Sequence, residues 1–166
     1  QLPESLLKIG IYAFQNCKNL KSIIIPNRVT EIGNCAFYDC KSLEEVQLPE
    51  SLLKIGESTF DHCKNLKSII IPNSVTEIRD SAFYSCGSLK EVQLPESLLK
   101  IGIYAFQNCK NLKSIIIPNR VTEIGNCAFY DCKSLEEVQL PESLLKIGES
   151  TFDHCKNLKS IIIPNS

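Results

Sequence analysis

Cysteine and histidine are the residue types in this sequence that most often mark a nucleophilic or metal-binding site. The 166 residues include nine cysteines and two histidines. Each histidine lies between an aspartate and a cysteine, in Asp61-His62-Cys63 and Asp153-His154-Cys155. A cysteine beside a histidine can become an activated nucleophile, but only if the two side chains come within hydrogen-bonding distance. Whether either histidine can activate its neighbouring cysteine therefore depends on how the fold orients the two side chains.

The spacing of the cysteines indicates that the chain is built from a 23-residue repeat. All seven phenylalanines and all eight prolines recur at the same interval. The three columns are Cys17, Cys40, Cys63, Cys86, Cys109, Cys132 and Cys155; Phe14, Phe37, Phe60, Phe83, Phe106, Phe129 and Phe152; and Pro3, Pro26, Pro49, Pro72, Pro95, Pro118, Pro141 and Pro164. Alternate repeats are the more similar, and residues 1–74 recur without change as residues 93–166. A fixed period of this length is typical of a solenoid.

The repeat predicts a single array of coils without capping repeats. The expected coils span residues 1–23, 24–46, 47–69, 70–92, 93–115, 116–138 and 139–161, with a partial coil at 162–166. One coil cannot bury its apolar stripe alone, but coils stacked on both sides bury a continuous core.

Each repeat combines a strand pattern with a predicted turn. Apolar residues alternate around Ile23, as a strand with one buried face requires. Pro26 cannot donate a backbone hydrogen bond and ends the strand ladder. A short extended or turn segment with Val29 and Ile32 follows, and A-F-x-x-C (36–40) is expected to form one helical turn. The sequence therefore predicts an α/β-type repeat solenoid, a curved rod with a parallel β-sheet on its concave face.

The motif L-x-x-I-x-I-P followed by A-F-x-x-C resembles the BspA-like class of leucine-rich repeats over the whole chain. The resemblance implies a secreted or surface-attached protein, extracellular or at the cell surface. It also implies adhesion to host or neighbouring cells through protein–protein contacts. Repeat scaffolds bind many different partners, so the resemblance implies function only by analogy.

Composition argues against two other classes of partner. The net charge of −1 provides no excess of basic residues for binding phosphates, so nucleic acid is not an expected partner. The longest apolar run is three isoleucines, at Ile23 to Ile25 and in its copies, so membrane insertion is not expected. No signal peptide is visible, and a chain that starts at Gln1 and lacks methionine is expected to be an excerpt or a processed form.

The cysteine column is expected to form a ladder of buried thiols. Stacked neighbours would lie roughly 5 Å apart, which a disulfide could span, but parallel side chains pointing into a core favour free thiols over disulfides or metal. Cys35 and Cys127 belong to a second column that also holds tyrosine and serine, which suits a partly exposed position. They are four coils apart, roughly 19 Å, so either could react between chains but not with the other. A chance substitution at a tolerant position is the alternative.

The histidines are not expected to be catalytic or to bind metal. His62 and His154 are also four coils apart. Their column holds Asn16, Asp39 and Ser85, which predicts that His62 faces solvent while Cys63 faces the core. No phosphate-binding or nucleophile-elbow motif occurs, so no catalytic residue, metal or cofactor is predicted. A glycine column is interrupted by Arg79, which favours an undemanding turn over a positive φ.

The outward positions of the predicted strands form the candidate binding surface. The candidate residues are Ser22, Ile24, Glu45, Gln47, Ser68, Ile70, Glu91, Gln93, Ser114, Ile116, Glu137, Gln139, Ser160 and Ile162. A flanking row holds Lys21, Glu44, Lys67, Lys90, Lys113, Glu136 and Lys159. These rows either dock an extended partner or simply separate like charges and satisfy β-propensity.

The predicted function is a non-enzymatic protein-interaction scaffold that mediates adhesion through its concave face. Two alternatives remain. Terminal coils without caps, ending at Gln1 and Ser166, would expose apolar residues and could stack end to end into a filament. The unchanged copy of 74 residues could also come from recent duplication or from an engineered repeat scaffold.

Overall fold

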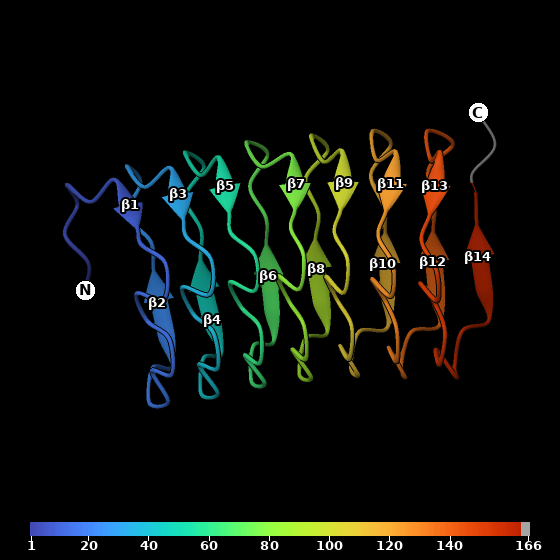
Figure 1. Cartoon of the computed structure of the whole chain (residues 1–166), viewed down its shortest axis with the longest axis horizontal. Helices are drawn as coiled ribbons and strands as arrows, with labels where there is room; N and C mark the ends of the chain where they lie inside the picture. The colour runs from blue at the N-terminus through green and yellow to red at the C-terminus, as the bar shows by residue number, and fades with distance from the viewer. Residues whose placement is uncertain (164–166) are drawn as a thin grey trace.

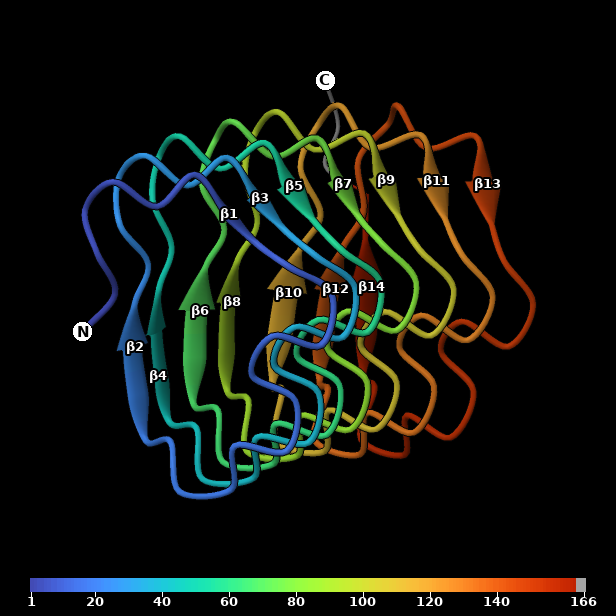
Figure 2. The same ribbon diagram turned by 60° about the vertical axis from the view of Figure 1, so that its left-hand side comes forward.

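The alternation of apolar and polar residues before each proline produces a three-residue strand in every coil. The computed structural model, which describes residues 1–163, consists of stacked coils with two rows of parallel strands (Figures 1 and 2). The first row is called the long-strand face and contains β2 (Ser22–Ile24), β4 (Glu45–Gln47), β6 (Ser68–Ile70), β8 (Glu91–Gln93), β10 (Ser114–Ile116), β12 (Glu137–Gln139) and β14 (Ser160–Ile162). From β2 to β12 the middle residue of each strand is buried or partly buried and the first residue is exposed.

A second row of two-residue strands forms where the sequence predicts an extended or turn segment. This short-strand face contains β1 (Lys8–Ile9), β3 (Glu31–Ile32), β5 (Lys54–Ile55), β7 (Glu77–Ile78), β9 (Lys100–Ile101), β11 (Glu123–Ile124) and β13 (Lys146–Ile147). All observed pairings in both rows are parallel and join residues 23 positions apart, for example Ile32 with Ile55. The repeat period therefore fixes the register of both faces.

Apolar columns of the repeat stack into one continuous core. The phenylalanine rings form a single stack from Phe14 to Phe152, with neighbouring centroids 5.2 to 5.6 Å apart. Five of these side chains are fully buried, from Phe37 to Phe129. Pro164 and the rest of residues 164–166, which include most of the expected partial coil, lie outside the described residues.

The A-F-x-x-C segment does not form a helix, so the prediction of a helical turn there is wrong. No helix occurs among residues 1–163. The N–H groups of Cys35 and Phe37 donate to carbonyl oxygens of the next coil, at 2.8 and 2.9 Å. The N–H groups of Ala36 and Tyr38 bond back within their own coil, but only across three residues. Backbone donors that a helix would use internally are thus shared with the neighbouring coil.

Left-handed residues are the second reason why this segment cannot be helical. Cys35 and Asp39 have φ values of 54° and 57°. The same conformation recurs throughout the columns that begin with Tyr12 and Asn16, at fourteen residues of which none is glycine. An α-helix of L-residues needs right-handed φ values throughout, so an alternation of this kind produces successive tight turns instead.

The glycine column is explained by the close approach of neighbouring coils. No glycine has a positive φ, in agreement with the prediction of an undemanding turn. However, a Cβ at Gly56 would lie 2.4 Å from the backbone nitrogen of Asn34, and one at Gly125 would lie 2.6 Å from the carbonyl carbon of Gly102. Real Cβ atoms do not come this close to backbone, so a side chain in this column from Gly33 onward must push two coils apart, whereas a Cβ at Gly10 would meet nothing within 4 Å.

Neither row of strands is one uninterrupted sheet. The short-strand row divides between β5 and β7 into sheets of three and four strands. The long-strand row divides between β4 and β6 and again between β8 and β10. The stack of coils is nevertheless continuous, because the buried core and the hydrogen bonds of the turns run through all three positions.

Candidate protein-binding surface

The structure places all fourteen candidate residues on the outward positions of the long strands. Twelve are exposed, while Gln139 and Ser160 are partly buried. The observed registers put them in two rows: Ser22 pairs with Glu45 and Ile24 with Gln47, and the same pairs recur in β6 with β8 and in β10 with β12. The sequence therefore predicts both the side of the coil and the order along the rod.

Isoleucine side chains project from every second strand of this face. Ile24, Ile70 and Ile116 are 67%, 64% and 65% exposed. Strands two coils apart are separated by about 9.6 Å, so these side chains form a spaced row and not a continuous patch. Each isoleucine is flanked along the row by glutamines, which leaves it accessible from outside.

Carboxylates alternate with serines in the second row of the face. Glu45, Glu91 and Glu137 are exposed, and none of them makes a direct ion pair with another residue of the described chain. In the flanking row the charges are partly paired: Lys67 bonds to Glu44, and the Lys159 ammonium lies 2.6 Å from Glu136. Within these pairs the nearby ammonium lowers the pKa of the Glu44 and Glu136 carboxyls. The three glutamates of the strand row thus remain available to a basic partner.

Two shallow grooves lie over this face. One, of about 480 Å³, is lined by β2, β4 and β6 and includes Ile24 and Ile70. The other, of about 380 Å³, is lined by β8 and β10 and includes Ile116. The exposed isoleucines thus form part of the walls of hollows in which a partner side chain could be partly enclosed.

A second exposed apolar row runs beside the short strands, and the sequence interpretation missed it. Leu7, Leu53, Leu99 and Leu145 are 53%, 63%, 40% and 85% exposed. The available signal was the Leu-Leu pair of every second coil, in which Leu6 faces the core and Leu7 faces solvent, whereas the other coils have Val-Thr. The rod therefore presents an apolar row on each strand face.

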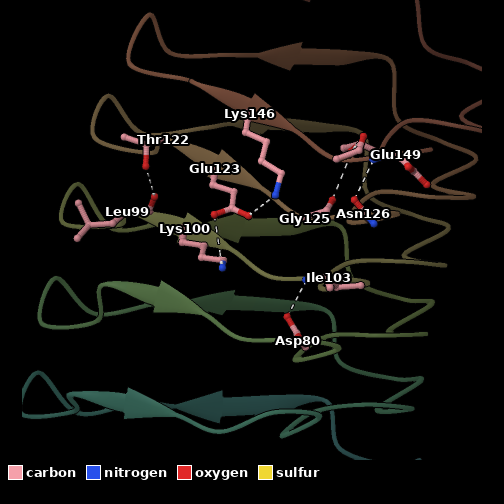
Figure 3. A network of polar contacts seen from close by, with 12 residues as sticks. Asp80, Leu99, Lys100, Ile103, Thr122, Glu123, Gly125, Asn126, Lys146 and Glu149 are labelled. Atoms are coloured by element: carbon pink, nitrogen blue, oxygen red, sulfur yellow. Dashed lines mark hydrogen bonds and ion pairs between the residues drawn. The ribbon is translucent and has the colours of Figure 1, made fainter.

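All charged residues of the short strands except Glu77 form ion pairs between coils, and Glu77 pairs with Arg79 of its own coil. Glu123 accepts from Lys146 at 3.0 Å and lies 3.5 Å from Lys100, so one carboxylate holds the lysines of both neighbouring coils (Figure 3). Glu31 is held in the same way by Lys8 and Lys54, and the lysines lower the pKa of both carboxyls. Beside these strands the Asn126 side chain accepts a hydrogen bond from the Glu149 N–H at 3.0 Å (Figure 3).

The structure separates each histidine from the cysteine that follows it. The thiol of Cys63 donates to the carbonyl oxygen of Phe37 at 3.2 Å inside the core. His62 points outward, with its Nδ1 2.5 Å from the Asp61 carboxylate and its ring between those of Tyr38 and Tyr84. The predicted orientations of His62 and Cys63 are confirmed, and the pair does not form a nucleophilic site.

The cysteine column forms the expected ladder of thiols, buried from Cys40 to Cys132 and partly buried at Cys17 and Cys155. Every thiol from Cys40 onward donates a hydrogen bond to a backbone carbonyl. The sulfurs of Cys40, Cys86 and Cys109 donate to phenylalanine carbonyls 26 residues earlier, at 3.0 to 3.3 Å. Burial raises the pKa of Cys40 to about 11 and that of Cys86 and Cys109 further. All nine cysteines are free thiols, and at these three buried positions the elevated pKa disfavours the reactive thiolate. At the end of the ladder the hydrogen bond with Cys132 lowers the pKa of the partly buried Cys155.

Cys35 and Cys127 lie at partly buried, left-handed positions. Burial and the nearby Asp61 raise the pKa of the Cys35 thiol, a shift opposite to that of an activated nucleophile. Among residues 1–163 no group of three cysteine, histidine or acidic side chains is arranged to hold a metal ion. The same part of the chain contains no helix long and apolar enough to cross a bilayer.

Comparisons with known proteins agree with this architecture. The sequence matches the family described as BspA type leucine rich repeat region, in six copies over residues 1–112 and 76–166. A leucine-rich repeat protein from Bacteroides ovatus is 35% identical with a TM-score of 0.85, over 98% of this chain and 48% of that protein. The T. pallidum leucine-rich repeat protein is also 35% identical, with a TM-score of 0.84, over 93% of this chain and 74% of that one. A search of the curated proteins found no match.

More distant structures share the fold. A leucine-rich cell surface protein from Faecalibacterium prausnitzii is 24% identical with a TM-score of 0.54, over 95% of this chain and 63% of that one. The pneumococcal vaccine antigen PcpA is 23% identical with a TM-score of 0.60, over 96% of this chain and 54% of that one. The chain thus spans about half the length of several of the proteins it resembles. The match of the family over its whole length shows that this chain belongs to the BspA-type leucine-rich repeat proteins.

Proposed function

We propose that this protein is a non-enzymatic scaffold that binds a protein partner through its long-strand face, and that it does so outside the cell in adhesion. The observation that carries the proposal is the row of exposed isoleucines next to glutamates that lack an ion pair. The surface combines spaced apolar anchors with free acceptors, which an extended, partly basic polypeptide can match. The extracellular location rests on membership of the repeat class.

The long-strand face is the better binding surface of the two strand faces because its charges are less satisfied internally. On the short-strand face Glu31 and Glu123 each hold two lysines, so a partner would have to break these contacts. On the long-strand face Glu45 and Glu91 need not give up an ion pair. Two grooves, of about 480 and 380 Å³, also lie over this face and include Ile24, Ile70 and Ile116 in their walls. This is the face expected to be concave, where repeat proteins commonly bind.

A scaffold also fits the lack of a reactive constellation in the described part of the chain. The buried thiols from Cys40 to Cys109 have raised pKa values and donate hydrogen bonds to backbone carbonyls, and Cys63 is turned away from His62. The near-neutral net charge of −1 does not favour nucleic acid as a partner. The fold itself is typically a non-enzymatic repeat scaffold, and the proposal extends that general property to this chain.

End-to-end assembly into a filament is the second candidate. Ile147 and Ile161 of the last complete coil are 48% and 49% exposed, whereas their repeat equivalents Ile55 and Ile69 are buried. Apolar surface of this kind could stack on the first coil of another copy. However, in-register stacking would place Lys146 next to Lys8, where the chain otherwise alternates lysine with glutamate. The charge pattern therefore favours a binding module over a filament.

The proposal is tested by replacing the isoleucine row and measuring binding to cells. Ile24, Ile70, Ile116 and Ile162 are changed together to glutamine, and the fluorescently labelled protein is titrated onto epithelial and bacterial cells in a flow cytometer. The matched control changes Leu7, Leu53, Leu99 and Leu145 to glutamine, which removes four exposed apolar side chains from the other face. Exposed substitutions are expected to leave stability nearly unchanged, and thermal unfolding of each variant checks this.

Loss of saturable binding in the isoleucine variant, with binding retained in the leucine variant, supports the proposal. Each well-placed anchor contributes more than about 1 kcal/mol to a typical interface, so the four changes should weaken binding at least tenfold. Equal loss in both variants, or loss only in the leucine variant, contradicts the choice of face. Wild-type protein that binds no cell surface, but whose mass in light scattering grows with concentration, favours the filament.

A further inference from the structure

The short-strand sheet is interrupted at one position, between β5 and β7. Elsewhere in this sheet the coils are joined by a regular pair of hydrogen bonds around each strand: Thr122 N–H donates to Leu99 at 3.0 Å and Gly125 N–H donates to Ile101 at 2.8 Å. The equivalent donors at the interruption are Thr76 and Arg79, and no bond from either to the preceding coil occurs in the described structure. The separation of β5 from β7 is visible in Figure 1.

The cause of the interruption is the residue at position 79. In the seven complete coils this column holds glycine at six positions and arginine only at 79. At Gly56, Gly102 and Gly125 a Cβ would lie 2.4 to 2.6 Å from atoms of the preceding coil. Arg79 carries such a Cβ, and it can be accommodated only if the coil that contains β5 moves away.

The structure contains its own control for this explanation. The sequence Val121-Thr-Glu-Ile-Gly125 is the repeat equivalent of Val75-Thr-Glu-Ile-Arg79 and differs from it only at the last residue. The strand in the first segment, β11, is paired on both sides, while that in the second, β7, is paired only with β9. Composition of the strand itself is therefore not the reason for the break.

The break between β4 and β6 has no comparable cause. Residues 45–70 and 137–162 have the same sequence, yet only the second segment forms a paired ladder, between β12 and β14. Between β8 and β10, Lys90 replaces the glutamate found as Glu44 and Glu136, so three lysines adjoin along that row. The break next to Arg79 is the one with a direct steric origin.

The other two sides of the same junction remain closed. On the long-strand face β6 and β8 are fully paired. On the turn side the N–H groups of Ser58 and Phe60 donate to the next coil at 3.0 and 2.9 Å. The junction is thus held along two edges and open along the third.

The phenylalanine rings on the two sides of this junction are rotated relative to each other. The rings of Phe60 and Phe83 are inclined by 12° to each other, whereas the other neighbouring rings are inclined by 4 to 7°. Their centroids remain 5.4 Å apart, so the contact is preserved while its angle changes. A hollow of about 240 Å³, lined by Leu53, Lys54 and Arg79 among others, lies at the opened edge.

We propose that Arg79 makes a built-in joint at which the rod opens on its short-strand side. The coils before and after the joint pivot about the paired strands β6 and β8 and the Phe60–Phe83 contact, so the curvature of the long-strand face changes there. This inference does not depend on the proposed function, because it concerns the mechanics of the rod alone. In an adhesive scaffold the joint would let the two halves of the surface adapt to a partner.

Hydrogen exchange of the whole chain, followed by mass spectrometry, tests the joint. The exchange rate of the backbone amides of residues 75–81 is compared with that of residues 121–127, and each rate is divided by the rate expected for the same segment when it is unfolded. Exchange from the first segment is expected to be at least about tenfold faster, since Thr76 and Arg79 lack the hydrogen bonds that Thr122 and Gly125 make. Arg79→Gly should remove this difference.

The matched control is Gly87→Lys, which replaces the other unusual residue of the same coil by the lysine of the other coils. A Cβ at Gly87 would meet nothing within 4 Å, so this variant should exchange like the wild type. Equal protection of the two segments in the wild type overturns the proposal. Persistence of fast exchange in Arg79→Gly also overturns it, because the opening would then have another cause.

Discussion

Phe83→Ala is the substitution that tests the stacked core most severely. Phe83 is fully buried in the central part of the rod, with its ring 5.4 Å from that of Phe60 and 5.2 Å from that of Phe106. Removing a buried phenylalanine costs about 3–5 kcal/mol through lost transfer energy and the remaining cavity. Two ring contacts, each contributing about 0.5–1.5 kcal/mol beyond burial, are lost in addition. The expected loss therefore lies at the upper end of this range.

The position within the repeat array determines how the loss appears. Stability in a solenoid is approximately a sum of coil and neighbour-interface contributions, so a weak central interface can separate the two ends. Urea unfolding followed by circular dichroism is expected to change from one transition to two for Phe83→Ala. The control is Phe14→Ala, because Phe14 is only partly buried and has one ring neighbour, Phe37. It should cost less and preserve a single transition.

A loss of less than about 1 kcal/mol for Phe83→Ala would contradict the placement of this ring in the stacked core. A side chain of the core cannot be removed so cheaply unless neighbouring coils collapse into the space. A loss for Phe14→Ala as large as that for Phe83→Ala would also be inconsistent with a stack whose contribution depends on two neighbours.

Three further predictions concern the thiols and the glycine column. Iodoacetamide at pH 8 should modify Cys35 and Cys127 in the native protein, but it should reach Cys63, Cys86 and Cys109 only in denaturant, because these three are buried with raised pKa values. Mass spectrometry of peptides identifies the modified sites, and rapid native labelling of the three buried cysteines would contradict the thiol ladder. Stability should fall as the pH rises from about 9, where unfolded thiols ionise, through about 11, the folded value for Cys40, because the unfolded chain then loses protons that the folded chain retains. Cys86→Ser should reduce the slope of unfolding free energy against pH in this range by about one proton, and an unchanged slope would show that Cys86 does not contribute. Gly125→Ala should destabilise the protein by about 1–3 kcal/mol in urea unfolding, because the new Cβ meets the backbone of Gly102. The control Gly87→Ala, whose new Cβ faces open space, should be neutral or slightly stabilising, and equal effects of the two variants would be evidence against the close approach of coils.

The core and the strand registers could be predicted from the sequence because they follow from its period. Apolar residues such as Phe37 and Ile32 recur every 23 positions, and stacking places each copy directly against the next. The outward positions of Ile24 and Glu45 follow from the same alternation. In a periodic sequence, the residue that lies next to a given residue along the rod can therefore be predicted as the one 23 positions away.

The turns could not be predicted in the same way. Tyr12, Cys35 and Ser58 take left-handed conformations that their side chains do not favour, so no local signal marks the place where the chain departs from a helix. The conformation is imposed by hydrogen bonds to the next coil, which are present only after stacking. The A-F-x-x-C pattern correctly indicates which side chains are buried but not the backbone that buries them.

The consequence of Arg79 was also hidden in the sequence. Its presence in a glycine column correctly excludes a requirement for positive φ. The distance between neighbouring backbones, which makes glycine necessary at Gly56 and Gly125, depends on the tertiary structure. The sequence shows that one coil differs, but the structure is needed to show that the difference opens a sheet.

Carboxylate footprinting of the cell-bound protein shows whether partners bind the long-strand face. Carbodiimide coupling of glycinamide is measured residue by residue, for protein free in solution and for protein bound to cells. Binding through the long-strand face should protect Glu45, Glu91 and Glu137, while Glu57 and Glu149, exposed beside the short strands, should be labelled as before. Protection of Glu57 and Glu149, with unchanged labelling of the three strand glutamates, would contradict it.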